Sequence, residues 1–155
     1  MKLAEALIER KACMIRIQNL DNRAQQNSIV EEGTKPVEDP EALRSEINDE
    51  VSKLYDYILR INHTNNTATI ESGETISDAI VKRDLLKMRI GHLNSLIAVS
   101  GQINRNRYSR DEAKEVCLLN VADLRKELDE LSKQYRELDT LIQAANWGSD
   151  LVEVK

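Results

Sequence analysis

Aromatic residues are scarce in this chain. Its 155 residues include no Phe, one Trp and four Tyr. The hydrophobic core must therefore be built from aliphatic side chains, mainly Leu, Ile, Val and Ala. A chain of this length is most simply one domain, so we predict a single helical-bundle domain over residues 1–155. At this size a compact fold buries roughly 70% of its unfolded surface, which is enough for a real core.

The residue types that carry catalysis or bind metals are also few. The two cysteines, Cys13 and Cys117, lie far apart and form no metal-ligand spacing, so we expect two reduced structural thiols. Cys117 lies in an apolar run, which favours an inert buried thiol. The two histidines, His63 and His92, belong to no zinc-binding or di-iron pattern, and no glycine-rich phosphate loop occurs. We therefore expect a protein that is not an enzyme and has no cofactor.

Long apolar runs are missing as well. The longest uncharged run, Ile90–Asn104, has 15 residues and includes His, Asn, Ser and Gln, whereas a membrane-spanning helix needs about 20 apolar residues. Glu5 and Glu9 interrupt the apolar core that a signal peptide would need at the N-terminus. We therefore expect a cytoplasmic location and no membrane partner.

Helical periodicity is what the sequence has in abundance. Apolar residues recur at steps of three and four, with an Asp39-Pro40 start for the second helix. The spacing predicts helices over residues 2–27, 40–61, 78–99 and 121–146. We therefore predict a mainly all-α fold, an antiparallel four-helix bundle made of coiled-coil hairpins.

The last predicted helix has the most regular apolar pattern. Its apolar positions alternate steps of three and four over more than three heptads, as in coiled coils. This pattern predicts a seam that serves as core or as oligomer interface. The central members of the seam are Leu124, Leu128, Leu131, Tyr135 and Leu138. We expect a homo-oligomer that uses this seam together with the apolar stripe of the first helix.

Two short β elements are predicted beside the helices. Residues 62–67 are rich in Asn and Thr, which are poor helix formers. Polar and apolar residues then alternate around a turn at Gly73, which predicts a small β-hairpin between the second and third helices. A further expectation is a short strand pairing of residues 28–30 with residues 115–119.

Basic residues are concentrated between Lys82 and Arg110. This stretch holds seven basic residues and one acidic residue, a net charge of +6 in a chain of net charge −5. Guanidinium groups in a polar loop can bind phosphate or carboxylate, which predicts a phosphate, RNA or nucleotide site. The loop arginines are Arg105, Arg107 and Arg110. The alternative is pairing with the acidic stretch 31–50, within or between subunits, and such structural ion-pair networks are common.

Arg83 lies on an apolar seam of the third predicted helix. One interpretation is a buried anchor for a carboxylate ligand. The other is pairing with a neighbouring acidic side chain of the chain itself, which is the more frequent role of such an arginine.

Several segments of the chain are typical of one family. They are MKLAEALIER, VEDPEAL, INHTNNTAT, GETISDAIVKRDLL, RYSRDE and RELDTLIQAANW. In these segments, and over nearly its whole length, the chain resembles a small family of bacterial proteins often labelled septicolysin or left uncharacterised. The resemblance implies a helical-hairpin fold with little assigned chemistry. The label itself would imply a cytolysin, although the sequence contains no strongly cationic amphipathic helix.

Three functional hypotheses follow from these observations. The leading one is a cytoplasmic, non-enzymatic helical binding or scaffold protein that acts as a homo-oligomer. The second is an RNA- or nucleotide-phosphate-binding module that uses the basic region 82–110. The third, more distant, is the cytolysin that the family label implies.

Overall fold

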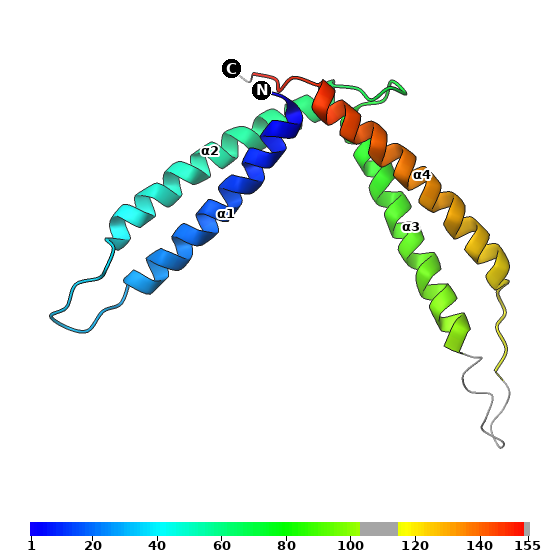
Figure 1. Cartoon of the computed structure of the whole chain (residues 1–155), viewed down its shortest axis with the longest axis horizontal. Helices are drawn as coiled ribbons and strands as arrows, with labels where there is room; N and C mark the ends of the chain where they lie inside the picture. Colours follow the sequence, from blue (N-terminus) through cyan, green and yellow to red (C-terminus); the bar gives the residue numbers. More distant parts are fainter. Residues whose placement is uncertain (103–114, 154–155) are drawn as a thin grey trace. The chain divides into compact units, whose positions relative to one another are not determined.

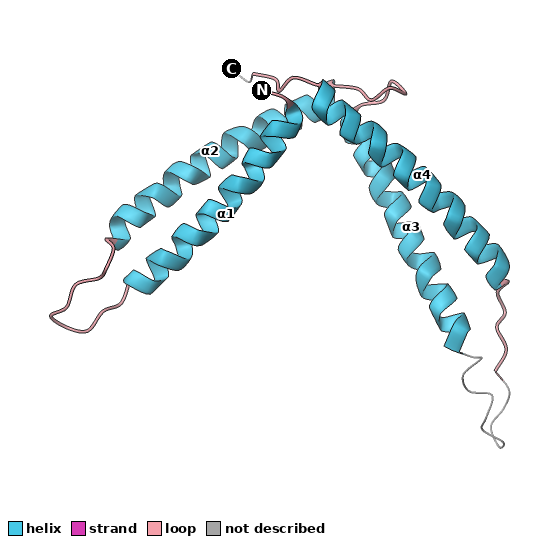
Figure 2. Cartoon of the chain, in the orientation of Figure 1, coloured by secondary structure: helices cyan, strands magenta, loops and turns pink. Residues whose placement is uncertain are grey.

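The described part of the chain is folded mainly into long α-helices, as a computed structural model shows (Figures 1 and 2). The structure describes residues 1–102 and 115–153. Within these ranges it contains four helices and no sheet, which confirms the all-α prediction. The helices are α1 Leu3–Asn27, α2 Pro40–Thr67, α3 Ile76–Gln102 and α4 Val121–Gly148.

The chain divides into two compact units. The first unit comprises Met1–Thr69 and Ala144–Lys155, and it contains α1, α2 and the last turn of α4. The second unit comprises Ile70–Gln143, and it contains α3 and most of α4. Each unit is built on a helical hairpin, as the sequence predicts. The association of both hairpins in one four-helix bundle and one domain stays a prediction.

The core of the first unit is aliphatic, as the scarcity of aromatic residues requires. Leu3, Ala6 and Cys13 of α1 are buried, and so are Leu43 and Ile61 of α2. On each helix these residues recur near the helical period, so they form the face along which α1 and α2 pack.

Two helix starts are capped by side chains, and the first of them is the predicted one. The Oδ1 atom of Asp39 accepts a hydrogen bond of 3.0 Å from the backbone N–H of Glu41, and Pro40 occupies the first position of α2. Asn120 Oδ1 accepts a hydrogen bond of 3.0 Å from the N–H of Ala122 at the start of α4. These local signals place both helix starts from sequence.

Helix α2 continues six residues beyond its predicted end and includes the Asn- and Thr-rich segment. Thr64 is buried, with an exposed fraction of 1%. Its hydroxyl donates a hydrogen bond of 2.8 Å to the carbonyl of Arg60 one turn earlier, which is compatible with helical backbone. Burial of Thr64 within the first unit therefore outweighs the weak helix propensity of its neighbours.

A tight turn replaces the predicted β-hairpin. The backbone N–H of Ile70 donates a hydrogen bond of 3.0 Å to the carbonyl of Glu74. Gly73 adopts a φ of +91°, which favours glycine. The Thr75 hydroxyl then caps α3 by accepting a hydrogen bond of 3.1 Å from the N–H of Asp78. Because α2 extends to Thr67 and α3 begins at Ile76, too few residues remain between them for two strands.

The predicted strand pairing of residues 28–30 with residues 115–119 is also wrong. Neither segment is a strand, and the side chains of Ile29 and Leu118 are 87% and 92% exposed. Ser28 instead terminates α1, and its hydroxyl donates a hydrogen bond of 2.8 Å to the carbonyl of Gln25. A few β-branched residues do not stabilise a β-ladder when their side chains are not packed against apolar neighbours.

Candidate functional site

Of the four predicted anion-binding arginines, the structure describes Arg83. Arg105, Arg107 and Arg110 lie outside the described residues. The Arg83 guanidinium donates to Asp84 at 3.0 Å and to Asp139 of α4 at 3.2 Å. Its carboxylate partners therefore come from the chain itself, and the side chain ties α3 to α4.

Two further basic residues in the described part of this stretch form ion pairs, and both have their partners inside the second unit. Lys82 pairs with Glu74 of the turn before α3, and Arg89 pairs with Glu127 of α4 at 3.3 Å. Neither acidic partner belongs to the stretch 31–50, which the sequence predicts as the alternative partner of the basic residues. Both ion pairs are exposed, so they contribute little to stability and remain open to exchange with other charges.

The acidic stretch 31–50 pairs within the first unit. Glu38 accepts hydrogen bonds from Arg23. Glu50 accepts hydrogen bonds of 2.6 Å from Lys53 and 2.8 Å from Arg16, and these two partners lower the pKa of the Glu50 carboxyl to about 2. A polar groove of about 420 Å³ between α1 and α2 surrounds Glu50. Because basic and acidic side chains alternate along it, the groove is largely neutralised from within.

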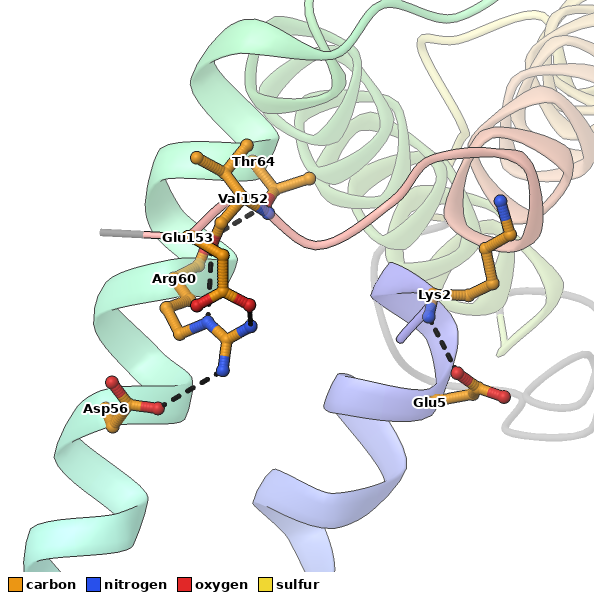
Figure 3. Close-up of polar contacts among 7 residues, drawn as sticks. All are labelled: Lys2, Glu5, Asp56, Arg60, Thr64, Val152 and Glu153. Atoms are coloured by element: carbon orange, nitrogen blue, oxygen red, sulfur yellow. Dashed lines mark hydrogen bonds and ion pairs between the residues drawn. The ribbon is translucent and has the colours of Figure 1, made fainter. Parts of the chain in front are cut away.

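The C-terminal strap, residues 149–153, closes the first unit (Figure 3). The Leu151 N–H donates to the Met1 carbonyl at 2.9 Å, and the Val152 N–H donates to Thr64 Oγ1 at 3.0 Å. Arg60 contacts the Val152 carbonyl at 3.2 Å and the Glu153 carboxylate at 2.6 Å. Figure 3 shows Arg60 enclosed by these groups and by Asp56. The strap thus fixes both chain ends through structural contacts.

The predicted seam of α4 lies on the packed face of that helix. Leu131 is buried, and the other predicted members are half-buried, namely Leu124, Leu128, Tyr135 and Leu138. Much of the apolar surface of this seam is therefore used inside the second unit. It leaves a smaller area for a partner than the sequence alone suggests.

A second apolar stripe runs along the outside of α3, and its side chains are more exposed than those of the α4 seam. Val81, Leu85, Met88 and Val99 are between 52% and 70% exposed. When the exposed His92 and Ser95 are included, successive positions along this line are alternately four and three residues apart. The stripe therefore has heptad spacing. A helix that is apolar on two faces is usually covered on both. We call these residues the α3 outer stripe.

The α3 outer stripe was not predicted from sequence, because the prediction for this helix rested on its inner seams. The signal was present, since the same heptad spacing recurs on both faces of α3. Buried Ala79 and Leu93 mark the inner face. Periodicity alone does not tell which of two apolar faces a neighbouring helix will cover.

A groove of about 560 Å³ lies beside the α3 outer stripe, between α3 and α4. Leucines line it from both helices, and charged side chains border it. The lining residues are Ser72, Glu74, Lys82, Leu85, Leu86, Arg89, Gln134, Glu137, Leu138 and Leu141. Leu85 belongs to both the groove and the α3 outer stripe, so the two form one continuous apolar surface.

The two cysteines lie in different environments. Cys13 is buried, as expected, but Cys117 is exposed, which corrects the prediction of a buried thiol. The apolar run around Cys117 precedes α4 as an uncovered connection, so its side chains are not packed. The Cys117 thiol lies 3.2 Å from the Ser100 hydroxyl, and this hydrogen bond lowers its pKa. Both thiols are free.

Membrane-spanning helices and metal-binding clusters are both absent from the described residues. Among them, no helix is long and apolar enough to cross a membrane. Residues 1–102 and 115–153 also contain no cluster of three or more His, Cys, Asp or Glu side chains that is arranged to hold a metal ion.

Comparison with known proteins places the chain in a family. A comparison with curated proteins finds no match. Among solved structures, the chain is similar to the crystal structure of a functionally unknown conserved protein from Corynebacterium diphtheriae. The TM-score is 0.90 and the identity 33%, over 98% of this chain and 99% of the other. A family model matches residues 10–151, so the chain belongs to the family of unknown function DUF6847.

Proposed function

We propose that this chain is a non-enzymatic helical scaffold or binding protein that acts as a homo-oligomer through the second unit. The observation that carries the proposal is the α3 outer stripe. Apolar side chains scattered singly over a surface are common and need no partner. Here they follow one heptad line on one helix, which is the arrangement that a second helix covers.

Burial of the α3 outer stripe would contribute to the free energy of association. Complete burial of one exposed Val, Leu or Met side chain contributes about 1.5–3 kcal/mol. Four such side chains, each 52–70% exposed, can contribute several kcal/mol in each copy, and a symmetric contact uses the stripe twice. This contribution offsets part of the entropy lost on association.

The charged side chains favour a binding role over catalysis. Around the groove, Lys82 and Arg89 are engaged in ion pairs with Glu74 and Glu127. Around the polar groove of the first unit, Glu50 is engaged with two basic side chains. Charged groups that are satisfied by their neighbours position surfaces, whereas catalysis requires a group free to act on a substrate.

The test is size-exclusion chromatography with light scattering on the wild-type chain and two matched variants. Met88→Glu places a charge in the α3 outer stripe, where the native side chain is 70% exposed. Tyr55→Glu makes a similar change at a 67% exposed position of α2. We expect an oligomer for the wild type and for Tyr55→Glu, and a monomer of unchanged helicity for Met88→Glu.

A monomeric wild-type chain across the micromolar range would overturn the proposal. Loss of the oligomer in Tyr55→Glu alone would place the contact on the first unit and would overturn its assignment to α3. Circular dichroism on each sample separates loss of assembly from loss of folding.

The same experiment tests the alternative function. Phosphate binding by Arg105, Arg107 and Arg110 predicts nucleic acid that co-elutes with protein purified without nuclease. Such material absorbs at 260 nm and leaves the protein when salt is raised, because phosphate contacts release counterions. We expect protein absorbance alone.

A further inference from the structure

We propose that the groove between α3 and α4 is occupied by α3 of a second copy, whose basic edge lies against the acidic stripe of the partner's α4. This inference rests on the proposed homo-oligomer and specifies its geometry. Grooves between two helices commonly accept a third helix through apolar anchors at helical spacing. The leucine-lined groove is bordered by the α3 outer stripe, so one helix of suitable pattern can cover both.

An acidic stripe on α4 reaches the groove at Glu137, which is one of the lining residues. It follows steps of four and three, as the neighbouring seam does, and passes through Gln134 and Leu141 of the groove lining. All its acidic members are exposed. We define it as Asp123, Glu127, Glu130 and Glu137.

The basic edge of α3 accompanies the α3 outer stripe. Lys82 and Arg89 directly follow Val81 and Met88 in sequence and are seven residues apart, so they occupy equivalent positions beside the stripe. Their side chains are 62% and 60% exposed. A helix that inserts its outer stripe into the groove therefore brings positive charge beside that stripe.

Charge complementarity selects the partner. The basic edge of one copy matches the acidic stripe of another, and a two-fold symmetric dimer makes this contact twice. A contact between the acidic stripes of two α4 helices would place like charges together and would be unfavourable. The same chain thus supplies the apolar helix and an acidic stripe beside the groove, and the Lys82 and Arg89 side chains that line the groove are themselves paired with Glu74 and Glu127.

The test uses two charge-reversed variants that should associate with each other but not with themselves. Variant A carries Lys82→Glu and Arg89→Glu, and variant B carries Glu127→Lys and Glu130→Lys. In a dimer of A, acidic edges meet acidic stripes, and in a dimer of B, basic edges meet basic stripes. In the mixed dimer both contacts regain opposite charges. We expect the dissociation constant of each variant alone to rise by at least about tenfold, and mixing to restore it.

Restoration by mixing is specific for a contact between copies. The ion pair between Arg89 and Glu127 within one chain is lost in both variants, and mixing does not restore it. Light scattering measures mass, and a size tag on variant B distinguishes the mixed dimer from either homodimer. Circular dichroism checks that each variant remains helical. If a double variant unfolds, the single variants Lys82→Glu and Glu130→Lys replace A and B in the same mixing experiment.

The outcomes separate this inference from the proposed function. If A and B alone remain as tightly associated as the wild type, the oligomer exists but α3 does not dock on α4, and the inference fails. If both variants are monomeric and stay so after mixing, charge pairing between α3 and α4 is also refuted. A monomeric wild type refutes the proposed function itself.

Discussion

Replacing Thr64 by Val tests whether the C-terminal strap stabilises the first unit. The two side chains have nearly the same shape, so no cavity forms, but the acceptor for the Val152 N–H at 3.0 Å is lost. Thr64 is 1% exposed, and an unpaired buried polar group costs about 1–3 kcal/mol. The hydroxyl also donates a hydrogen bond to the Arg60 carbonyl within α2. That carbonyl remains part of the helical backbone when the hydroxyl is removed.

We expect Thr64→Val to lower the free energy of unfolding by about 1–2 kcal/mol. The loss is at the lower end of the range because the Val152 N–H can form a hydrogen bond with water instead. For a chain of this size that corresponds to a fall in Tm of about 2–8 °C. The matched control is Thr67→Val on the same helix. The exposed Thr67 hydroxyl donates to the His63 carbonyl at 2.9 Å and has no contact with the strap. Thermal and urea unfolding followed by circular dichroism measure both variants.

A chain that ends at Leu151 completes a double-mutant cycle. This shortened chain keeps the hydrogen bond from Leu151 to Met1 but lacks the Val152 N–H. In the shortened chain we expect Thr64→Val to leave the free energy of unfolding almost unchanged, since the Val152 N–H that donates to the hydroxyl is absent. An equal loss of stability in the full and shortened chains would show that the strap contact contributes nothing, and the reasoning would be refuted.

Three further predictions concern core packing, acid stability and thiol reactivity. Leu131→Ala removes a buried side chain of α4, so we expect a loss of about 2–5 kcal/mol in urea unfolding, and an unchanged midpoint would contradict the packing. Glu50 has its pKa lowered to about 2 by its basic partners, so its contribution to stability is present above the unfolded pKa of about 4.3 and is lost as the pH falls toward 2. Glu50→Gln should therefore lose less stability than the wild type between those pH values. A thiol reagent should modify the exposed Cys117 rapidly and the buried Cys13 only after unfolding, and Cys117→Ser should abolish the rapid phase.

The helix starts could be read directly from sequence because their determinants are local. Asp39 and Asn120 accept hydrogen bonds from backbone N–H groups two residues later, so the signal and the effect lie within one turn. The α4 seam could be predicted as well, because apolar positions that keep heptad spacing over more than three heptads leave little freedom in which face is packed.

The end of α2 could not be read in this way. Residues 62–67 have low helix propensity, and the expectation of a β-hairpin followed from it. The decisive contacts join Thr64 to Val152, which lies 88 positions later in the sequence. Such a contact contributes to the stability of the helix without appearing in any local pattern.

The sequence by itself determined the aliphatic core, the helical period and the caps of α2 and α4. It also determined that basic residues gather between Lys82 and Arg110. The tertiary structure decided which apolar face of α3 is covered inside the second unit and which charges neutralise one another, as Arg83 and Asp139 do. The physical reason is the distance along the chain over which each effect acts. Helix propensity and capping act within one or two turns. Burial and charge pairing depend on residues that meet only after the chain has folded.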